Sequence, residues 1–244
     1  MPIHTLSHFW VIIPAAGIGS RMQASLPKQY LEIANESILE HTVRCFLSHP
    51  SFDSVAIGLA KQDPYFKRLS LSNNDRVDVF EGGGERVHSV LNGLTFLADK
   101  AQANDWVWVH DAARPCLSHD DIDALINSLS HAQDGCLLAV PIYDTIKRSD
   151  TSSQVEETVD RNNLWRAMTP QVFRYSQLYG ALTKCVDNDV LVTDESSAIE
   201  YCGGRPLLVS GSERNIKVTR PNDLELVGQA IIESKSSLQT DINE

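Results

Sequence analysis

The sequence predicts an α/β fold in which helices cover both faces of a mostly parallel sheet. Apolar runs of strand length recur at residues 9–13, 55–59, 77–80, 106–109 and 136–140. Between these runs lie segments whose apolar residues repeat with the spacing of a helix. Strands and helices that alternate in this way are typical of a parallel sheet buried on both faces. With 244 residues, 42% of them hydrophobic, the chain is large enough for one such domain, which we expect to span residues 1–244.

Three helices are predicted between the strands, and a fourth is predicted after them. The apolar positions with helical spacing are residues 39, 43, 46 and 47, then 90, 91, 94 and 97, and then 122, 125, 126 and 129. Ser118 followed by Asp121 resembles a capping box at the start of the third helix. Pro221 stands where a first helical residue would precede apolar residues 224, 227 and 231. From about residue 234 the chain reads as a polar tail that frays.

The alternation of strands and helices breaks between residues 142 and 165. A polar stretch at residues 149–153 separates two short β-like pieces there, so we expect a hairpin arm that projects from the domain. An ordinary long surface loop would read the same way from these residues alone.

The charge balance excludes a broad nucleic-acid surface. Lys and Arg number 21 against 32 Asp and Glu, which gives a formal net charge of −11 at pH 7. An anionic ligand must therefore find a local basic pocket, and we expect no nucleic-acid partner. The apolar stretch at residues 9–19 contains Pro14 and is too short to cross a bilayer, so we expect no membrane partner either.

The cysteines are widely scattered and form no CxxC pair, which argues against a zinc site and against a disulfide framework. We expect small buried hydrophobes in a cytoplasmic protein. The five are Cys45, Cys116, Cys136, Cys185 and Cys202.

A glycine-rich loop follows the first predicted strand and reads as a polyphosphate cradle. Its small residues let backbone N–H groups approach a phosphate, while two cations add positive charge. A dinucleotide-binding turn would need a third glycine where Met22 stands, and no G-K-[ST] of a P-loop occurs. A tight turn whose glycines serve packing only is the remaining alternative. The residues concerned are Ala15, Ala16, Gly17, Gly19, Arg21 and Lys28.

A second glycine cluster, Gly82 to Gly84, follows the third predicted strand and precedes Ser89 at the opening of a helix. Such a turn can press backbone against a flat base, and Ser89 could hydrogen-bond the base or the ribose. A flexible connection between strand and helix would have the same residues.

A carboxylate follows the fourth predicted strand, at the edge of the sheet where ligands of open α/β folds bind. Asp111, followed by the small residue Ala112, is therefore a candidate for a metal–nucleotide contact. Arg114 could equally be an ion-pair partner of Asp111, and His110 reads as a hydrogen-bonded residue at the strand end. Residues 215–219 read as a short strand before the last helix, in which Lys217 has no role that composition alone can assign.

Taken together, the motifs resemble those of the 2-C-methyl-D-erythritol 4-phosphate cytidylyltransferases. They occur in order over almost the whole chain: PAAGIGSRM with PKQY, GGGERVHSV, VHDAARP, PIYDTIKR, TVDRNNLW with TPQVF, TDESSAIEYCG, and NIKVTRPNDL. The resemblance implies a Rossmann-like nucleotidyltransferase domain with a projecting β-arm that clasps a second subunit in a homodimer. It implies transfer of CMP from CTP to 2-C-methyl-D-erythritol 4-phosphate, with release of pyrophosphate and with Mg²⁺ as cofactor.

The resemblance also implies a role for each matched residue. Ala15, Ala16, Gly17, Gly19, Gly83, Ser89 and Ala112 would bind the nucleotide, and Asp111 would bind both the nucleotide and Mg²⁺. Arg21, Lys28 and Lys217 would be the catalytic cations, while Thr145, Arg161 and Thr169 would hold the acceptor, the first two from the neighbouring subunit. The sequence departs from the family at Gly84, where some members carry an acidic residue beside the nucleotide, and at Met168, where Gln is frequent.

This chemistry suits the residues, because the obstacle is repulsion between a nucleoside triphosphate of about −4 and a phosphate monoester of about −2. The nucleophile is an already ionised phosphate oxygen, so no general base is required. A ribitol 5-phosphate cytidylyltransferase is the nearest alternative, since a single methyl group changes affinity by only about 1 to 3 kcal/mol. A catalytically silent CTP-binding module is a further alternative, which the presence of the catalytic cations disfavours. An oxidoreductase is another, which the missing third glycine disfavours.

Overall fold

The structure is a computed structural model that describes residues 7–17 and 26–241, with side chains described through residue 233. Its centre is a seven-stranded sheet in the order β11-β7-β10-β6-β1-β4-β5. The strands are β1 (Phe9–Pro14), β4 (Val55–Leu59), β5 (Val77–Glu81), β6 (Trp106–Val109), β7 (Cys136–Pro141), β10 (Trp165–Arg174) and β11 (Leu207–Ser210). All neighbours pair in parallel except β10, which is antiparallel to β6 and β7. The prediction of a mostly parallel sheet is confirmed.

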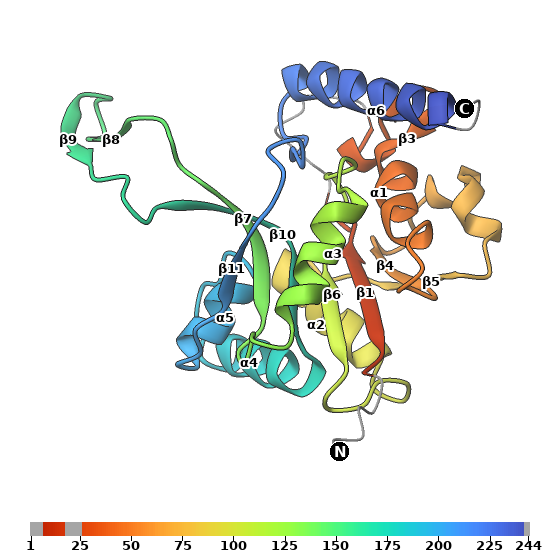
Figure 1. Cartoon of the computed structure of the whole chain (residues 1–244). Coiled ribbons are helices and arrows are strands. Elements are labelled where there is room, and N and C mark those ends of the chain that lie inside the picture. Colours follow the sequence, from red (N-terminus) through yellow and green to blue (C-terminus); the bar gives the residue numbers. More distant parts are fainter. Residues whose placement is uncertain (1–6, 18–25, 242–244) are drawn as a thin grey trace.

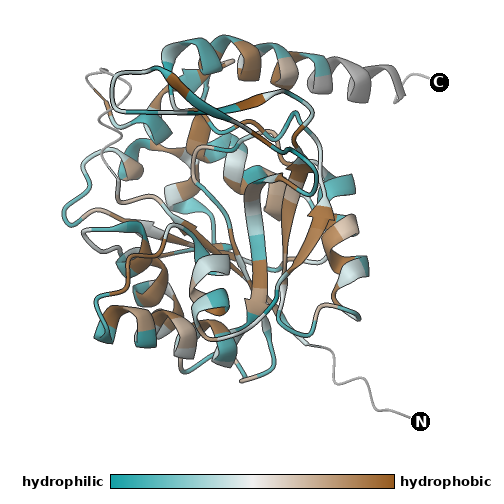
Figure 2. Ribbon diagram, turned by 90° about the vertical axis from the view of Figure 1, so that its left-hand side faces the viewer, coloured by the Kyte–Doolittle hydropathy of each residue, from teal (hydrophilic) through white to brown (hydrophobic). Residues whose placement is uncertain are grey.

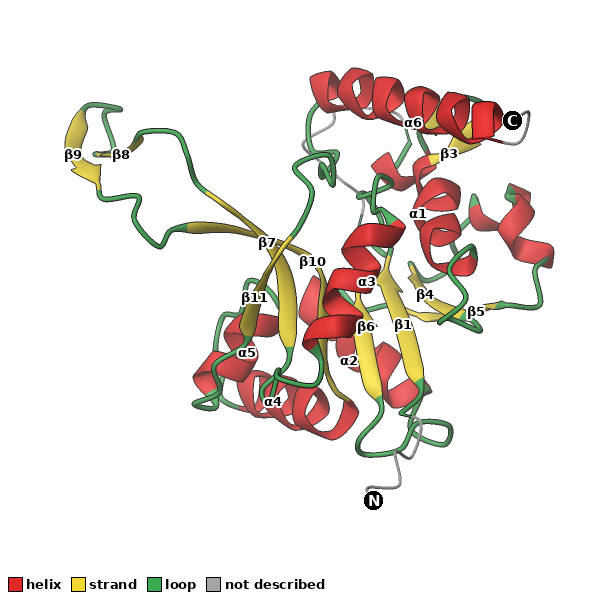
Figure 3. Cartoon of the chain, viewed as in Figure 1, coloured by secondary structure: helices red, strands yellow, loops and turns green. Residues whose placement is uncertain are grey.

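Helices cover both faces of this sheet (Figure 3). They are α1 (Ile38–Leu47), α2 (Arg86–Phe96), α3 (His119–Ser128), α4 (Tyr175–Asp187), α5 (Glu195–Tyr201) and α6 (Pro221–Asp241). Short 3-10 helices are η2 (Lys28–Tyr30), η3 (Phe66–Arg68) and η4 (Ser70–Asn73), and a small hairpin joins β2 (Glu32–Ile33) to β3 (Glu36–Ser37).

Alternation along the strands divides the core into two layers, one on each face of the sheet. In β6, Trp106 and Trp108 pack on the layer that contains α1 and α3, whereas Val107 and Val109 pack on the layer of α2, α4 and α5. All four side chains are buried, which is why the strand reads as a continuous apolar run. Hydropathy colouring shows hydrophobic strands enclosed between helices (Figure 2).

The predicted helix starts at Ser118 and Pro221 are confirmed. Ser118 accepts a hydrogen bond from the backbone of Asp121, whose side chain accepts one in return from the Ser118 N–H, so α3 begins with a complete capping box. Helix α6 begins at Pro221 and lies across the end of the sheet, where Val227 and Ile231 pack on Ile38. Its backbone stays helical to Asp241, beyond the residue at which we expected a polar tail. Within the described part of the chain, none of the helices has the length and apolar composition that a bilayer crossing requires.

The segment between β7 and β10 is an arm that extends well away from the body of the domain (Figure 1). Its tip is a two-stranded antiparallel hairpin of β8 (Ile146–Ser149) and β9 (Val155–Val159). Between a hairpin and an ordinary loop, the structure therefore shows the hairpin.

One predicted strand is wrong. Residues 215–219, all of which the structure describes, form a loop, and the edge strand beside β7 is β11 instead. With no sheet edge to join, the loop is held by side chains: Arg114 donates to the Asn215 carbonyl at 2.7 Å, and the Asn215 amide donates to the Thr169 carbonyl at 2.8 Å. The Val218 N–H donates to the Ala113 carbonyl at 2.8 Å, which fixes Lys217 beside the end of β6.

Candidate active site

A pocket opens at the carboxyl end of the sheet, where the chain leaves β1, β5 and β6. The strand order places β1 between β4 and β6, so connections depart from β1 in opposite directions, and such a switch point is where open α/β sheets bind ligands. The pocket is lined by Pro14, Ala15, Ala16, Gly17, Lys28, Gln29, Gly83, Gly84, Glu85, Arg86, Ser89, Asp111, Ala112, Ala113 and Lys217. All predicted nucleotide-binding residues within the described part of the chain are in this set.

The loop after β1 is fixed by Gln29, to which no local sequence pattern assigns a role. Gln29 is buried, and its side-chain amide donates to the carbonyls of Ala15 at 2.7 Å and Gly17 at 3.1 Å. These bonds consume backbone acceptors and leave the small residues facing the pocket, as a phosphate cradle requires. Gly19 and Arg21, two of the predicted site residues, lie outside the described residues.

The second glycine loop is shaped by Ser89. Its hydroxyl accepts from the Gly83 N–H at 2.9 Å and lies 3.1 Å from the Glu85 carbonyl. A Cβ at Gly83 would come within 2.3 Å of the His88 Cβ, whereas a Cβ at Gly84 would meet no atom within 4 Å. The close backbone approach is therefore required at Gly83, and the space that an acidic side chain would fill at Gly84 is open.

Asp111 lies at the pocket floor among several charged side chains. It is only 7% exposed, yet three cations contact its carboxylate: Lys217 at 2.9 Å and Arg114 at 3.2 Å on Oδ2, and Arg86 at 3.2 Å on Oδ1. Burial on its own would raise the pKa of Asp111, but the positive charges of Arg86, Lys217 and Arg114 outweigh it and hold the pKa far below its usual range. Asp111 is therefore ionised at any physiological pH.

The neighbouring His110 is neutral and structural. Its Nε2 lies 3.0 Å from the Arg114 carbonyl, which can only accept, so Nε2 carries the proton. Its Nδ1 then accepts from the Thr169 hydroxyl at 3.1 Å, and the same hydroxyl oxygen accepts from the Asp111 N–H at 3.0 Å. Burial lowers the pKa of His110 to about 4. Through Thr169, the imidazole thus holds the backbone of Asp111.

Thr169 is placed by an irregularity in β10. The register of the β7–β10 ladder shifts between Ala167 and Gln171, which is a bulge of the kind found beside functional sites. Thr169 is buried and supports Asp111 from behind, rather than lining the pocket. Met168, one of the two departures from the family, is buried in the core beside it.

Two lysines distant in sequence meet at the pocket. Lys28 donates from Nζ to the carbonyl of Val218 at 2.9 Å, and Val218 directly follows Lys217. The η2 turn and the loop before α6 thus bring both predicted catalytic lysines to one rim. Lys217 was the residue to which composition assigned no role, because only the fold shows that it faces Asp111.

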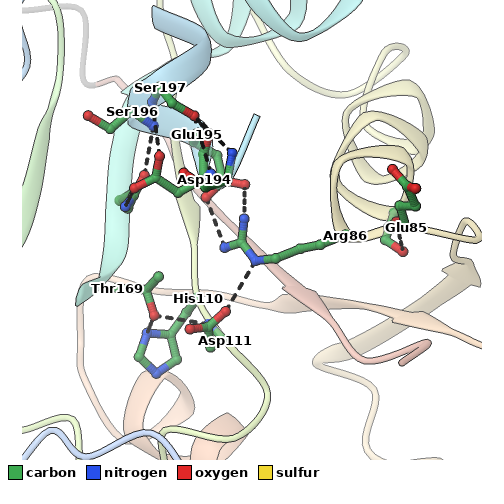
Figure 4. Close-up of polar contacts among 12 residues, drawn as sticks. Glu85, Arg86, His110, Asp111, Thr169, Asp194, Glu195, Ser196 and Ser197 are labelled. Carbon is green, nitrogen blue, oxygen red and sulfur yellow. Dashed lines mark hydrogen bonds and ion pairs between the residues drawn. The ribbon is translucent and has the colours of Figure 1, made fainter. Parts of the chain in front are cut away.

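One ion pair of the site, between Arg86 and Glu195, was not predicted. Arg86, the first residue of α2, donates from both terminal nitrogens to the carboxylate of Glu195, at 2.5 and 2.9 Å, and from Nε to Asp111 (Figure 4). Burial would lower the pKa of Arg86, but Glu195 and Asp111 raise it. The sequence placed Arg86 at a helix start after three glycines, and nothing local connects it with Glu195, 109 positions away.

The predicted acceptor residues on the arm are not brought to this pocket by their own chain. Thr145 and Arg161 are exposed, and the Arg161 guanidinium donates to the Tyr143 carbonyl within the arm. Neither residue lines the pocket.

Asp111 suits a metal ion that arrives with a nucleotide. Among the described residues, no three or more His, Cys, Asp or Glu side chains are grouped to hold a metal ion. Mg²⁺ does not need such a cage, since it keeps several waters and binds one or two carboxylates together with substrate phosphates. One ionised carboxylate at the floor of this pocket therefore fits a Mg²⁺ ion that also binds substrate phosphates.

Comparison with known proteins identifies a family model and relatives that share one name. The model of the family described as 2-C-methyl-D-erythritol 4-phosphate cytidylyltransferase matches residues 9–234. Proteins of that name from Pseudomonas putida and Tolumonas auensis are 51% and 49% identical to the chain, covering 93% and 89% of it and 97% and 94% of their own lengths.

Solved structures agree with the sequence relatives. The crystal structure of a 4-diphosphocytidyl-2C-methyl-D-erythritol synthase has a TM-score of 0.81 at 36% identity, covering 92% of this chain and 99% of its own. That of the 2-C-methyl-D-erythritol 4-phosphate cytidylyltransferase from Francisella tularensis has a TM-score of 0.79 at 38% identity, covering 92% and 100%.

Proposed function

The chain belongs to the 2-C-methyl-D-erythritol 4-phosphate cytidylyltransferase family, and from this premise we propose that the pocket around Asp111 and Lys217 is the site at which it acts. The enzyme transfers CMP from CTP to 2-C-methyl-D-erythritol 4-phosphate in non-mevalonate isoprenoid biosynthesis. The observation that carries the assignment of the site is the convergence of Lys28, Lys217 and Asp111 on two small-residue loops.

The two glycine loops hold the nucleotide. The Ala15 to Gly17 backbone approaches the phosphates, and the Gly83 turn, kept tight by Ser89, presses on the base and ribose. Ala112, beside Asp111, completes the wall. With no side chain at Gly84, this chain makes no side-chain contact to the nucleotide there.

The transfer itself is a substitution at phosphorus. A phosphate oxygen of the acceptor forms a bond to the α-phosphorus of CTP, and the bond from that phosphorus to the bridging oxygen of pyrophosphate breaks. Negative charge grows on the α-phosphate oxygens during this exchange, where Lys28 and Lys217 stabilise it. Arg21 is proposed as a third cation on the resemblance alone.

Mg²⁺ would be held by Asp111 together with the triphosphate. When bound, it supplies electrostatic stabilisation of the phosphate charge and of the departing pyrophosphate. The ion pairs of Asp111 keep this carboxylate ionised and oriented, so the residues of the chain prepare the site before the nucleotide enters.

A homodimer joined through the arm would complete the site. An isolated two-stranded hairpin is only marginally stable in water, and the arm exposes Tyr143 (70%) and Val155 (62%), so packing against a second chain would stabilise it. Thr145 and Arg161, which do not line the pocket of their own chain, would then reach the acceptor in the pocket of the partner. We also propose a cytoplasmic location, which five cysteines without a disulfide support.

The proposal is tested by measuring pyrophosphate release from CTP and Mg²⁺ with 2-C-methyl-D-erythritol 4-phosphate and, separately, with ribitol 5-phosphate. We expect turnover with the first acceptor, and its loss when EDTA removes the metal. Lys28→Ala and Lys217→Ala should each lower kcat by roughly 10² or more, as does the loss of one preorganised charge-stabilising group elsewhere.

The matched control is Lys61→Ala, which removes an exposed lysine that is 3.9 Å from Glu81. It should turn over like the wild type. Wild-type kcat in both Lys28→Ala and Lys217→Ala would reject the assigned site, and preference for ribitol 5-phosphate would reject the assigned acceptor.

A further inference from the structure

Arg86 connects Asp111 at the pocket floor to Glu195 at the start of α5. Its guanidinium makes a bidentate contact with the Glu195 carboxylate and a further hydrogen bond to Asp111 (Figure 4). We propose that Arg86, anchored by Glu195, is a positioning residue of the cytidylyl transfer, which acts by fixing the orientation of the Asp111 carboxylate. The inference rests on the proposed function of the pocket.

Glu195 is a rigid anchor. Its side chain is 1% exposed, and it is the first residue of α5, whose N-terminus is closed by a capping box from Asp194. Gln171 ties this N-terminus to β10, because its amide donates to Asp194 at 2.9 Å and accepts from the Ser196 N–H at 2.8 Å. A carboxylate held in this way, contacting both terminal nitrogens, fixes the plane of the guanidinium.

The fixed guanidinium in turn restrains Asp111. Arg86 holds Oδ1, whereas Oδ2 is shared by Arg114 and Lys217, so both oxygens of the carboxylate have partners. Without Arg86 the carboxylate could rotate about its terminal torsion, which is a soft one. Lys217 lies in a loop with no sheet pairing, so its ion pair with Asp111 is a main restraint on its head group.

The rate of cytidylyl transfer depends on the positions of Asp111 and Lys217 more than CTP affinity does. A displacement of about 1 Å in a catalytic group can cost up to roughly 10²-fold in rate. CTP binding, in contrast, is spread over the backbone of two glycine loops; Arg86 lines the same pocket, but its side-chain hydrogen bonds go to Glu195 and Asp111. A fall in kcat at nearly constant CTP affinity is therefore the signature of positioning.

Replacing both charged residues of the ion pair by neutral ones distinguishes a positioning role of Arg86 from a role in stability alone. Arg86→Gln leaves Glu195 buried without its partner, which is strongly destabilising by itself. The double variant Arg86→Gln/Glu195→Gln removes both charges and leaves two amides that can bond each other. We expect the double variant to regain most of the melting temperature and to bind CTP by calorimetry within about threefold of wild type, while its kcat stays roughly 10-fold or more lower.

Arg86→Lys is a second variant that keeps a positive charge for Glu195 but cannot contact both carboxylates as the planar fork does. We expect it to fold, to bind CTP like the wild type and to have a reduced kcat. The matched control is Lys100→Gln/Asp78→Asn, which neutralises an exposed pair at 3.0 Å, and should leave kcat unchanged.

Wild-type kcat in Arg86→Lys or in the double variant would overturn the inference and make the ion pair purely structural. A parallel loss of CTP affinity and kcat would also overturn it, because Arg86 would then bind the nucleotide itself. These outcomes are distinct from a failure of the proposed function, in which the wild type itself would release no pyrophosphate.

Discussion

At Asp111, burial and neighbouring charge act in opposite directions on one carboxyl group. Burial raises its pKa, and three cations lower it further than burial raises it, so the group stays ionised while removed from water. The same surroundings keep His110 neutral, since burial lowers its pKa to about 4. Adjacent residues thus have fixed and opposite protonation states, and the site contains a permanent anion without a general base beside it.

The neutral His110 predicts a pH dependence of stability. An unfolded histidine binds a proton below its ordinary pKa of 6.5, whereas the folded imidazole binds one only near pH 4. The folded state therefore carries fewer protons between pH 6.5 and 4, and the free energy of unfolding should fall by roughly 3 kcal/mol as the pH drops through this window. Urea unfolding at a series of pH values measures the effect.

The variant His110→Gln isolates this contribution, because glutamine has no titrating group but can still donate and accept. Its unfolding free energy should depend less on pH between 6.5 and 4 than that of the wild type. The Asp111 contribution is lost only at lower pH, since its folded pKa is depressed. Equal pH slopes in both proteins would contradict a buried neutral His110.

In the glycine loop after β5, we expect substitutions at Gly83 and Gly84 to have different effects on CTP affinity. Gly83→Ala should lower CTP affinity strongly, because the new Cβ would lie 2.3 Å from the His88 Cβ and force the loop to move. Gly84→Ala should bind CTP within about threefold of wild type, because nothing lies within 4 Å of its Cβ. Calorimetric titration with CTP compares the two, and similar losses in both variants would show that the loop geometry is misassigned.

At the scale of elements, several residues of the candidate site lie in irregular segments, outside regular helices and strands. Lys217 lies in a loop that Asn215 and Arg114 hold through side-chain contacts, and Thr169 lies at a bulge of β10. The arm is the other such element, since among the described strands β8 and β9 pair only with each other. In each case a residue that we propose for the site lies where the chain leaves the main ladder of the sheet.

The arm predicts a change in acceptor affinity alone. Arg161→Ala should raise KM for 2-C-methyl-D-erythritol 4-phosphate several-fold more than KM for CTP, because a cation that meets the acceptor phosphate is lost while the nucleotide loops are intact. Steady-state kinetics with each substrate varied in turn measures both constants. Arg68→Ala, an exposed arginine of η3, is the control. A selective loss of CTP affinity in Arg161→Ala would remove this residue from the acceptor site.

For the molecule as a whole, a net charge of −11 coexists with a site for two anionic substrates. The strand order resolves this conflict, because the switch point at β1 gathers cations from distant parts of the chain at one edge of the sheet. Asp111 and Glu195 balance part of the positive charge of these cations in the folded site. The arm projects from the domain (Figure 1), and its exposed residues Thr145 and Arg161 do not line the pocket of their own chain.

The proposed dimer predicts complementation between two damaged chains. A Lys217→Ala chain has an intact arm, and an Arg161→Ala chain has an intact pocket. At low acceptor concentration each should be nearly inactive, but an equimolar, co-refolded mixture should recover roughly a quarter of wild-type activity, because half of the dimers are mixed and each of these has one intact site. Activity of the mixture no greater than the average of its two components would contradict a site shared between chains.

Much of the fold was predictable because burial leaves a local pattern in the sequence. The strands at residues 55–59 and 106–109 match β4 and β6, and the capping box at Ser118 marks the start of α3. Strand β10 was missed because Pro170 and polar residues interrupt its apolar pattern, and β11 was missed because its outer side chains are exposed.

The sequence by itself determined the layered α/β architecture, the two glycine loops and the residue types needed to balance phosphate charge, because periodicity and turn chemistry are local properties. Only the tertiary structure decided which charges meet. The pairing of Arg86 with Glu195 and of Lys217 with Asp111 joins residues more than a hundred positions apart, and the distance between two charges, which sets both their pKa values and their chemistry, is fixed by the fold alone.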